Sequence, residues 1–214
     1  MHTDTALGVV AGGSGNGFAR VFKIPLSRKR AIIRLLNCEF KWMDVGEVNG
    51  RIFLVTCGAG MDAHISSIFE HGPRRGMLAY FVAVFKVFFG YKPPHMKILY
   101  DGKTLDVDPI LISAANLEQY GGGVRIAPGA SPFDGYLDLA IVDKMNLFKM
   151  LWNLPKLFMG FVRKVPETTI LRIKEATITM ESSGPVHLDG DPMEPSNTLK
   201  IRVLPGALKI AILK

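Results

Sequence analysis

Alternating hydrophobic and polar positions dominate the chain from about residue 40 onward and predict mainly β-strands. Asn49-Gly50 and Asp101-Gly102 each join two such segments and are typical of type I′ hairpin turns. Because the strands outnumber the helices and arrive as hairpins, we expect a largely antiparallel sheet or sandwich with a few helices. The expected strands are 40–48, 51–57, 97–100, 103–107, 109–115, 136–142, 168–180, 198–203 and 207–213.

Helical patterns occupy a smaller part of the chain. Ser27 is of a residue type that caps helix N-termini, and Pro155 is expected to break the longest helix. The apolar stretch 77–89 contains Lys86 and is shorter than the roughly 20 residues that span a bilayer. We interpret it as a buried core helix, with an interfacial helix as the alternative. The expected helices are 18–22, 27–37, 62–70, 76–91 and 146–163.

The first 39 residues differ in character from the rest. A short apolar strand, 7–10, runs into the glycine-rich segment 11–17 and then into a helix, which is how an α/β unit begins. One strand cannot build a parallel sheet covered by helices. We therefore predict that residues 1–39 are the C-terminal remnant of an α/β domain and that residues 40–214 form a β-rich domain. The fold class is then α+β.

Composition narrows the range of partners without choosing one. The chain has 214 residues, is 48% hydrophobic and carries a formal net charge of +7, which suits a folded domain with anionic partners. Nucleotides, phosphorylated substrates, nucleic acid and anionic lipid headgroups all qualify. Cys38 and Cys57 form no disulfide framework, and the five histidines lack zinc-ligand spacing, so we expect a reducing cytosol.

The loop formed by Gly12, Gly13, Ser14, Gly15 and Asn16 is a candidate phosphate-binding segment. Glycines let backbone amides converge on an anion, Ser14 adds a hydroxyl donor, and the following helix contributes its positive N-terminal end. No Gly-Lys-Ser/Thr follows, so the loop is not a Walker A motif. By composition alone, a tight strand-to-helix turn is equally expected.

Gly58, Gly60 and Ala63 match the dinucleotide pattern G-x-G-x-x-A in form. Two observations weigh against that function. The preceding strand is expected in a hairpin rather than in a parallel unit, and no acidic residue lies about 20 positions on to bind the ribose.

Three further segments allow two interpretations each. The run from Tyr120 to Gly123 suits a flexible or closely approached loop, or an ordinary turn. Asp134 with neighbouring carbonyls suits a hard cation such as magnesium, or a turn. Residues 144–164 combine basic and aromatic side chains, which suits an anionic membrane surface, or core packing with solvated lysines.

The segment Leu188-Asp189-Gly190-Asp191-Pro192 places two carboxylates on a glycine-containing turn. Such a turn can hold a carboxylate rigidly, where it could orient a substrate hydroxyl or take its proton. For a lone Asp-Gly pair, a simple hairpin turn is the alternative.

Taken together and in this order, these segments resemble the diacylglycerol kinase-type lipid kinase family, which includes bacterial lipid kinases and sphingosine kinase-like members. The resemblance runs from about residue 7 to the end. The segments that carry it are 12–20, Asp44-Val45-Gly46-Glu47-Val48-Asn49-Gly50-Arg51, 58–63, 120–123, Asp134-Gly135-Tyr136-Leu137-Asp138 and 188–192.

The resemblance implies an N-terminal α/β domain that binds ATP and a C-terminal β-sandwich-like domain that binds lipid, with the active site between them. It assigns nucleotide contacts to the glycine loop, here Ser14 and Asn16, with Gly17 standing where bacterial members often have Asp. It assigns the catalytic base to Asp189 or Asp191, the latter standing where Glu is usual. It places a structural Mg²⁺ at Ser131, Asp134 and Tyr136.

The family's main nucleotide motif, Gly-Gly-Asp-Gly-Thr, would precede residue 7, so we expect this chain to lack most of the ATP-binding half. The function implied is phosphorylation of a lipid hydroxyl by ATP. The alternatives are a non-catalytic lipid-binding module and, less favoured, an enzyme like NAD kinase. The expected partners are a lipid substrate and a membrane surface rather than nucleic acid, with homodimerisation as an option. The expected location is the cytoplasm, in peripheral association with membrane.

Overall fold

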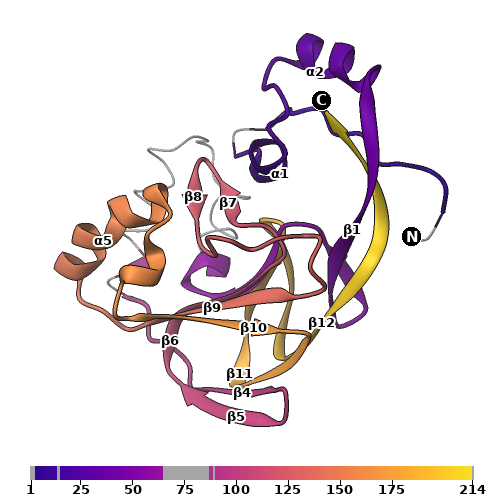
Figure 1. The fold of residues 1–214 in the computed structure, drawn as a ribbon. Helices are drawn as coiled ribbons and strands as arrows, with labels where there is room; N and C mark the ends of the chain where they lie inside the picture. The colour runs from indigo at the N-terminus through magenta and orange to yellow at the C-terminus, as the bar shows by residue number, and fades with distance from the viewer. Residues whose placement is uncertain (1–2, 14, 65–86, 89, 214) are drawn as a thin grey trace.

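A computed structural model describes residues 3–13, 15–64, 87–88 and 90–213. In these residues one ten-stranded sheet dominates, and every pairing between its strands is antiparallel, as the sequence predicted (Figure 1). Its main order is β10-β9-β6-β3-β11-β12-β1-β2, and β4 and β5 attach to it through β11. The strands are β1 Cys38–Val48, β2 Arg51–Phe53, β3 Thr56–Gly60, β4 Met96–Tyr100, β5 Lys103–Val107, β6 Pro109–Ala115, β9 Leu137–Asp143, β10 Thr168–Ile173, β11 Glu175–Leu188 and β12 Asp191–Leu213. A separate small hairpin consists of β7 Gln119–Gly121 and β8 Val124–Arg125.

Strand β11 divides the sheet into two branches. One side of β11 pairs with β12, whereas the other side pairs with β4 at residues 176–180 and with β3 at residues 186–188. The two branches enclose the main apolar core, which gives the expected sandwich-like α+β fold. The largest fully buried side chains of this core are Phe53, Met96, Ile98, Ile112, Leu137, Leu139, Ile141 and Ile173.

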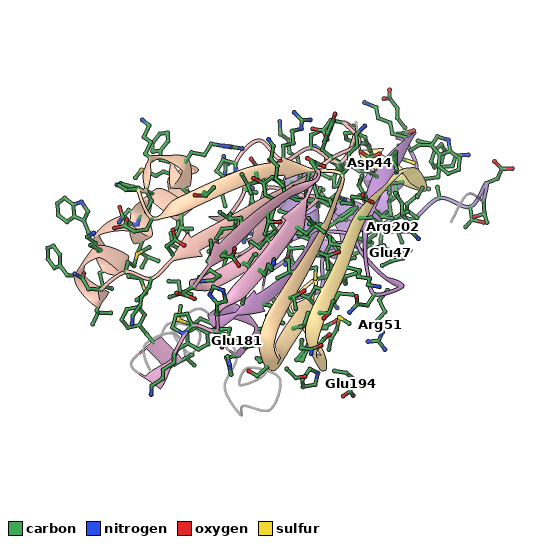
Figure 2. All side chains as sticks on the ribbon, turned by 90° about the horizontal axis from the view of Figure 1, so that it is seen from below. Asp44, Glu47, Arg51, Glu181, Glu194 and Arg202 are labelled. Atoms are coloured by element: carbon green, nitrogen blue, oxygen red, sulfur yellow. The ribbon has the colours of Figure 1, made fainter. Side chains whose placement is uncertain are left out.

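The two predicted hairpins are confirmed. Asn49-Gly50 and Asp101-Gly102 have positive φ at both positions (49° and 81°, 46° and 72°), as a type I′ turn requires. The register between β1 and β12 is also held by a two-point ion pair, in which Arg202 Nε donates to Glu47 Oε1 at 2.8 Å (Figure 2).

Four strand predictions were wrong in extent. The strand expected at 51–57 breaks after Phe53, because the amides of residues 54–56 turn toward the carboxylate of Asp189. The strand expected at 168–180 divides at Lys174 into β10 and β11. The strands expected at 198–203 and 207–213 are parts of β12, which continues through both because β1 pairs with it on either side of a bulge.

The N-terminal segment contains α1 Gly17–Val21 and α2 Arg28–Leu35, with Ser27 in the N-cap position as expected. Residues 7–10 are not the strand that was predicted: Leu7 makes a single parallel bridge to Ile210 of β12, and residues 8–10 do not continue the pairing. The predicted division at residue 40 lies inside β1 and stays a prediction.

Helix α5 spans Leu147–Met159 and a 3-10 turn follows at Val162–Lys164. The expected break at Pro155 was wrong: one proline removes a single helical hydrogen bond, and the helix continues past it to Met159. Its N-terminus is capped by Asn146, whose Oδ1 accepts from Lys149 N at 2.8 Å. Of the helices predicted at 62–70 and 76–91, most positions lie outside the described residues; residues 61–64 are helical.

The N-terminal helices and α5 lie on opposite sides of the molecule, with the β7–β8 hairpin between them. Strands β1 and β12 run side by side toward α1 and α2, α5 lies at the opposite side of the molecule, and the β7–β8 hairpin stands between α1 and α5 (Figure 1). The glycine loop before α1 bridges to this hairpin through Asn16 and Gly121.

Candidate active site

The Asp189-Gly190 pair forms the two-residue turn between β11 and β12. Both residues have positive φ, 52° and 97°, and the flanking Leu188 and Asp191 face each other across the hairpin. The turn is therefore a hairpin turn in its backbone, as the simpler interpretation of the sequence had it.

The carboxylate of Asp189 does more than close a turn. Its Oδ2 accepts from Leu54 N at 2.8 Å, and its Oδ1 accepts from Val55 N at 2.7 Å and Thr56 N at 3.0 Å. Its own N donates to Thr56 O at 2.8 Å. A carboxylate offers about four acceptor positions, so one position on Oδ2 remains after these three bonds.

Burial raises the pKa of Asp189, and the three backbone N–H bonds act against that rise. The same burial raises the pKa of the neighbouring Cys57 thiol, with Asp62 and Asp189 adding to it, so Cys57 stays protonated and is a core residue. Asp191 begins β12 and is exposed, as Asp189 is, but the three amides of residues 54–56 donate to the carboxylate of Asp189 and not to that of Asp191. The two carboxylates of the turn thus lie in different environments.

The glycine loop closes on itself through Asn16. The Asn16 side chain accepts from Gly13 N at 3.1 Å and donates to Gly13 O at 2.6 Å, and Arg20 Nε donates to Gly15 O at 3.1 Å. Gly12 and Gly13 are exposed. Ser14 lies outside the described residues.

The same loop packs tightly on the Tyr-Gly-Gly-Gly hairpin. Gly122 N donates to Gly15 O at 2.9 Å, and a Cβ added to Gly17 would lie 2.6 Å from Tyr120 O. The hairpin is therefore a closely approached one, as one of the two sequence interpretations expected, and only glycine fits at residue 17 without a backbone shift.

Residues 131–136 form a turn that two carboxylates, those of Asp134 and Asp44, organise. Asp134 Oδ1 accepts from Tyr136 N at 3.1 Å, and its Oδ2 pairs with Arg172, whose guanidinium lies 4.4 Å from the Tyr136 ring centroid. Buried Asp44 accepts from Gly135 N at 2.7 Å and from Gly206 N at 2.8 Å. Sequence reasoning gave Asp44 no such anchoring role, because its partners lie far along the chain.

These residues fit a magnesium ion only in part. Ca²⁺ and Mg²⁺ sites use oxygen ligands, of which Asp134 offers one carboxylate, and Arg172 already supplies the positive charge beside it. The described residues contain no group of three or more His, Cys, Asp or Glu side chains placed to hold a metal.

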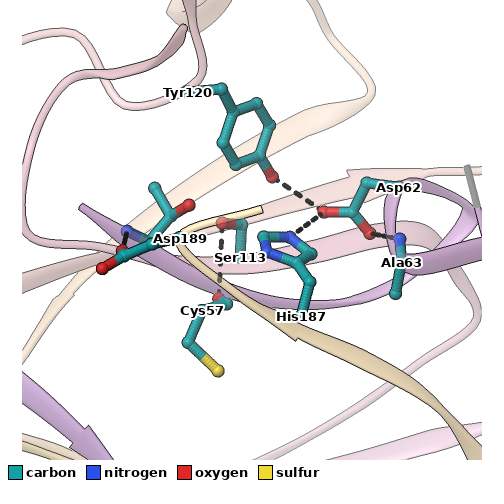
Figure 3. A network of polar contacts seen from close by, with 8 residues as sticks. Cys57, Asp62, Ala63, Ser113, Tyr120, His187 and Asp189 are labelled. Atoms are coloured by element: carbon teal, nitrogen blue, oxygen red, sulfur yellow. Dashed lines mark hydrogen bonds and ion pairs between the residues drawn. The ribbon is translucent and has the colours of Figure 1, made fainter. Parts of the chain in front are cut away.

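A buried polar network that sequence reasoning missed lies beside the catalytic-turn candidate (Figure 3). Asp62 Oδ2 accepts from Tyr120 Oη at 2.9 Å and from His187 Nε2 at 2.9 Å, and Asp62 Oδ1 accepts from Ala63 N at 2.8 Å. Each of the three residues stands in or next to a quoted motif, and that adjacency is the signal that could have found them. Gly58, from the G-x-G-x-x-A segment, lies in β3, which pairs antiparallel with both β11 and β6. The first of the two reasons given against dinucleotide binding, that this strand is not part of a parallel unit, is therefore confirmed.

Helix α5 exposes an aromatic and basic surface, which we call the α5 surface. Phe148 and Trp152 are 74% and 71% exposed, and their rings stack with centroids 6.4 Å apart. The interpretation of residues 144–164 as core packing was therefore wrong for these side chains. Among the described helices, none has the length and apolar content needed to cross a membrane. The other exposed members of the surface are Leu151, Met159, Phe161, Lys149, Arg163 and Lys164.

Comparisons with known proteins agree with this architecture. The family model of the YegS C-terminal NAD kinase beta sandwich-like domain matches residues 55–212, and that of the diacylglycerol kinase catalytic domain matches residues 1–48. A diacylglycerol kinase of Mycobacterium tuberculosis (strain CDC 1551 / Oshkosh) is 28% identical over 220 residues, covering 97% of this chain and 69% of the relative. A diacylglycerol kinase of Bacillus subtilis (strain 168) is 30% identical over 151 residues, covering 68% of this chain and 49% of the relative.

Solved structures share the fold. A crystal structure of a diacylglycerol kinase from Bacillus anthracis str. Sterne superposes with a TM-score of 0.70 at 21% identity, covering 100% of this chain and 69% of that chain. A second structure from that organism gives a TM-score of 0.79 at 22% identity, covering 100% and 70%. The chain thus spans between half and about two thirds of the length of the relatives cited above. With a family model matched over most of its length, the chain belongs to the diacylglycerol kinase-type lipid kinase family.

Proposed function

We propose that this chain is part of an ATP-dependent lipid kinase, which transfers the γ-phosphoryl group of ATP to a lipid hydroxyl. The observation that carries the proposal is the anchored carboxylate of Asp189, which three backbone amides hold with one acceptor position left on Oδ2. Family membership supports a kinase with a lipid substrate.

In the proposed reaction, Asp189 Oδ2 accepts the hydrogen bond of the lipid hydroxyl. As the hydroxyl oxygen attacks the γ-phosphorus, the bond to the β,γ-bridging oxygen breaks, ADP leaves, and the hydroxyl proton passes to Asp189. The exposed carboxylate of Asp191 would orient the acceptor at the mouth of the turn. We propose that ATP enters as its magnesium complex and that the loop of Gly12, Gly13, Ser14, Gly15 and Asn16 contacts its phosphates.

The test is transfer of labelled phosphate from ATP to lipid, measured with the 214-residue chain and with the full-length protein that its gene encodes. Vesicles that contain diacylglycerol or sphingosine are the acceptors, and NAD is the matched soluble acceptor. Labelled lipid supports the proposal, and labelled NAD would instead favour the alternative that the protein is an NAD kinase-like enzyme. Vesicle binding by both proteins without nucleotide binding or transfer would instead favour the lipid-binding module, which the α5 surface also suits.

Magnesium at Ser131, Asp134 and Tyr136 is a separate proposal with its own prediction. If Asp134 holds the ion, Arg172 competes with it for the same carboxylate. Arg172→Ala is then expected to increase the rise in Tm that millimolar Mg²⁺ causes, because a ligand that binds only the folded state stabilises it in proportion to RT ln(1 + [L]/Kd). Arg172→Lys, which keeps the charge, is the control. Equal Mg²⁺ shifts in the wild type and both variants would contradict the assignment.

A further inference from the structure

The buried Asp62 and His187 form, with the partly buried Tyr120, a cluster that the proposed phosphoryl transfer does not use. His187 and Asp62 have side chains that are 3% and 8% exposed, and their Nε2 and Oδ2 atoms lie 2.9 Å apart. Burying such groups is costly unless they are paired. Because a carboxylate has no proton to donate, the donor in the contact between His187 and Asp62 is the Nε2–H of His187.

The surrounding backbone is shaped to admit this pair. Gly58 faces His187 across the β3–β11 pairing, and a Cβ added to Gly58 would lie 2.6 Å from His187 Nε2 and 2.7 Å from Asp62 Oδ2. Any side chain at residue 58 would therefore displace the pair. His187 Nδ1 is buried and has no hydrogen-bond partner among the described residues, a cost that packing alone does not explain.

The cluster joins two segments that the proposed reaction needs. At one end, His187 is two residues before Asp189 on the strand that enters the turn. At the other end, Tyr120 begins the glycine hairpin, whose Gly122 N donates to Gly15 O at 2.9 Å. A continuous path of covalent and hydrogen bonds thus runs from the glycine loop to the turn that carries Asp189.

We propose that Tyr120, Asp62 and His187 are positioning residues that hold the Asp189 turn at a set place relative to the glycine loop. The catalytic role of these residues rests on the proposed function. The bonded connection between the glycine loop and the Asp189 turn is a property of the fold itself. In a phosphoryl-transfer enzyme such a link would keep the base aligned with the phosphates, and small misplacements of reacting groups are costly in rate.

Tyr120→Phe is the sharpest test, because it removes the hydroxyl that bonds Asp62 and keeps the ring. Hydrogen exchange is expected to become about three- to tenfold faster at the amides of residues 15–17, 54–56 and 187–190, on the order of what one lost hydrogen bond gives. Tyr100→Phe, an equivalent change on β4 away from the cluster, is the control and is expected to leave these amides unchanged. Unchanged exchange at 187–190 in Tyr120→Phe would overturn the proposal, whether or not the protein is a kinase.

His187 provides a rescue experiment. His187→Leu is expected to speed exchange as Tyr120→Phe does, whereas His187→Gln keeps an N–H donor at similar reach and is expected to restore most of the protection. A general loss of stability would instead affect both variants and would also speed exchange on distant strands such as β10.

Kinetics separate this proposal from the proposed function. With an active wild type, Tyr120→Phe is expected to lower kcat about 10- to 100-fold while the KM values for ATP and lipid stay within about twofold. An unchanged kcat would overturn the positioning role alone. If exchange changes as expected and the wild type transfers no phosphate to any acceptor, the link between loop and turn stands and the proposed function fails.

Discussion

Asp189→Asn is expected to lower kcat for lipid phosphorylation by about 10²- to 10⁴-fold, the range that general-base catalysis contributes. The amide has nearly the same shape but cannot take the proton of the lipid hydroxyl. Its oxygen can still accept from two of the three amides at residues 54–56, so the variant is expected to lose about 1–3 kcal/mol of stability and stay folded. Initial rates at saturating ATP and lipid, with Tm measured in parallel, check both expectations.

The chain offers two controls for this variant. Asp101→Asn changes the exposed aspartate of an Asp-Gly turn with nearly the same φ values, and it is expected to leave kcat unchanged. Asp191→Asn changes the carboxylate that follows the Asp189-Gly190 turn and is expected to lower kcat less than Asp189→Asn does. A larger loss in Asp191→Asn, with activity kept in Asp189→Asn, would move the base to Asp191.

The pH dependence of kcat/KM adds a further check on the same residue. Because burial raises the pKa of Asp189, the acid limb of the profile is expected above the usual aspartate value of about 3.9. Activity is then lost as pH falls through the folded-state pKa, where the base becomes protonated. The residual activity of Asp189→Asn is expected to lack this limb.

Replacing Phe148 and Trp152 together by serine is expected to weaken binding to anionic vesicles by about 100-fold or more. Each large side chain contributes about 1.5–3 kcal/mol when it is fully buried, and both are exposed and stacked on the α5 surface. The basic residues around them add attraction to anionic headgroups, which salt weakens. Co-sedimentation with phosphatidylglycerol vesicles at low and high salt measures both contributions.

A matched control lies at the other side of the molecule. Phe40 and Trp42 on β1 are 58% and 44% exposed and lie near the Lys209 ammonium, so they are also an aromatic and basic pair. Replacing both by serine is expected to leave vesicle binding within about threefold, well under the cost of one fully buried side chain. Equal losses in the two double variants would show that binding is non-specific and would contradict a docking role for α5.

The sequence predicted features whose causes are local. The type I′ turns at Asn49-Gly50 and Asp101-Gly102 formed where expected, because positive φ at both positions is a property of those residue pairs. The antiparallel architecture followed from short connections between strands. The sequence showed that residues 144–164 are basic and aromatic but not whether they are exposed, since the same pattern suits a core helix and a surface helix. The position of Pro155 also did not determine where the helix ends.

The candidate site depended on contacts between distant segments. Contacts between residues more than 50 positions apart cause the strand break after Phe53, give Asp44 its anchoring role and form the Asp62–His187–Tyr120 cluster. The periodicity of a sequence carries no information about such pairs.

Asp101 and Asp189 show most directly what the local sequence determines and what only the tertiary structure decides. Each precedes a glycine in a two-residue hairpin turn with similar φ values, and local sequence determines that much for both. Only the tertiary structure decides that Asp101 is exposed at a hairpin tip, while Asp189 lies over the amides of residues 54–56, which are some 134 residues away. The physical reason is that turn geometry depends on neighbouring dihedral angles, whereas the environment of a carboxylate depends on which distant backbone the fold brings to it.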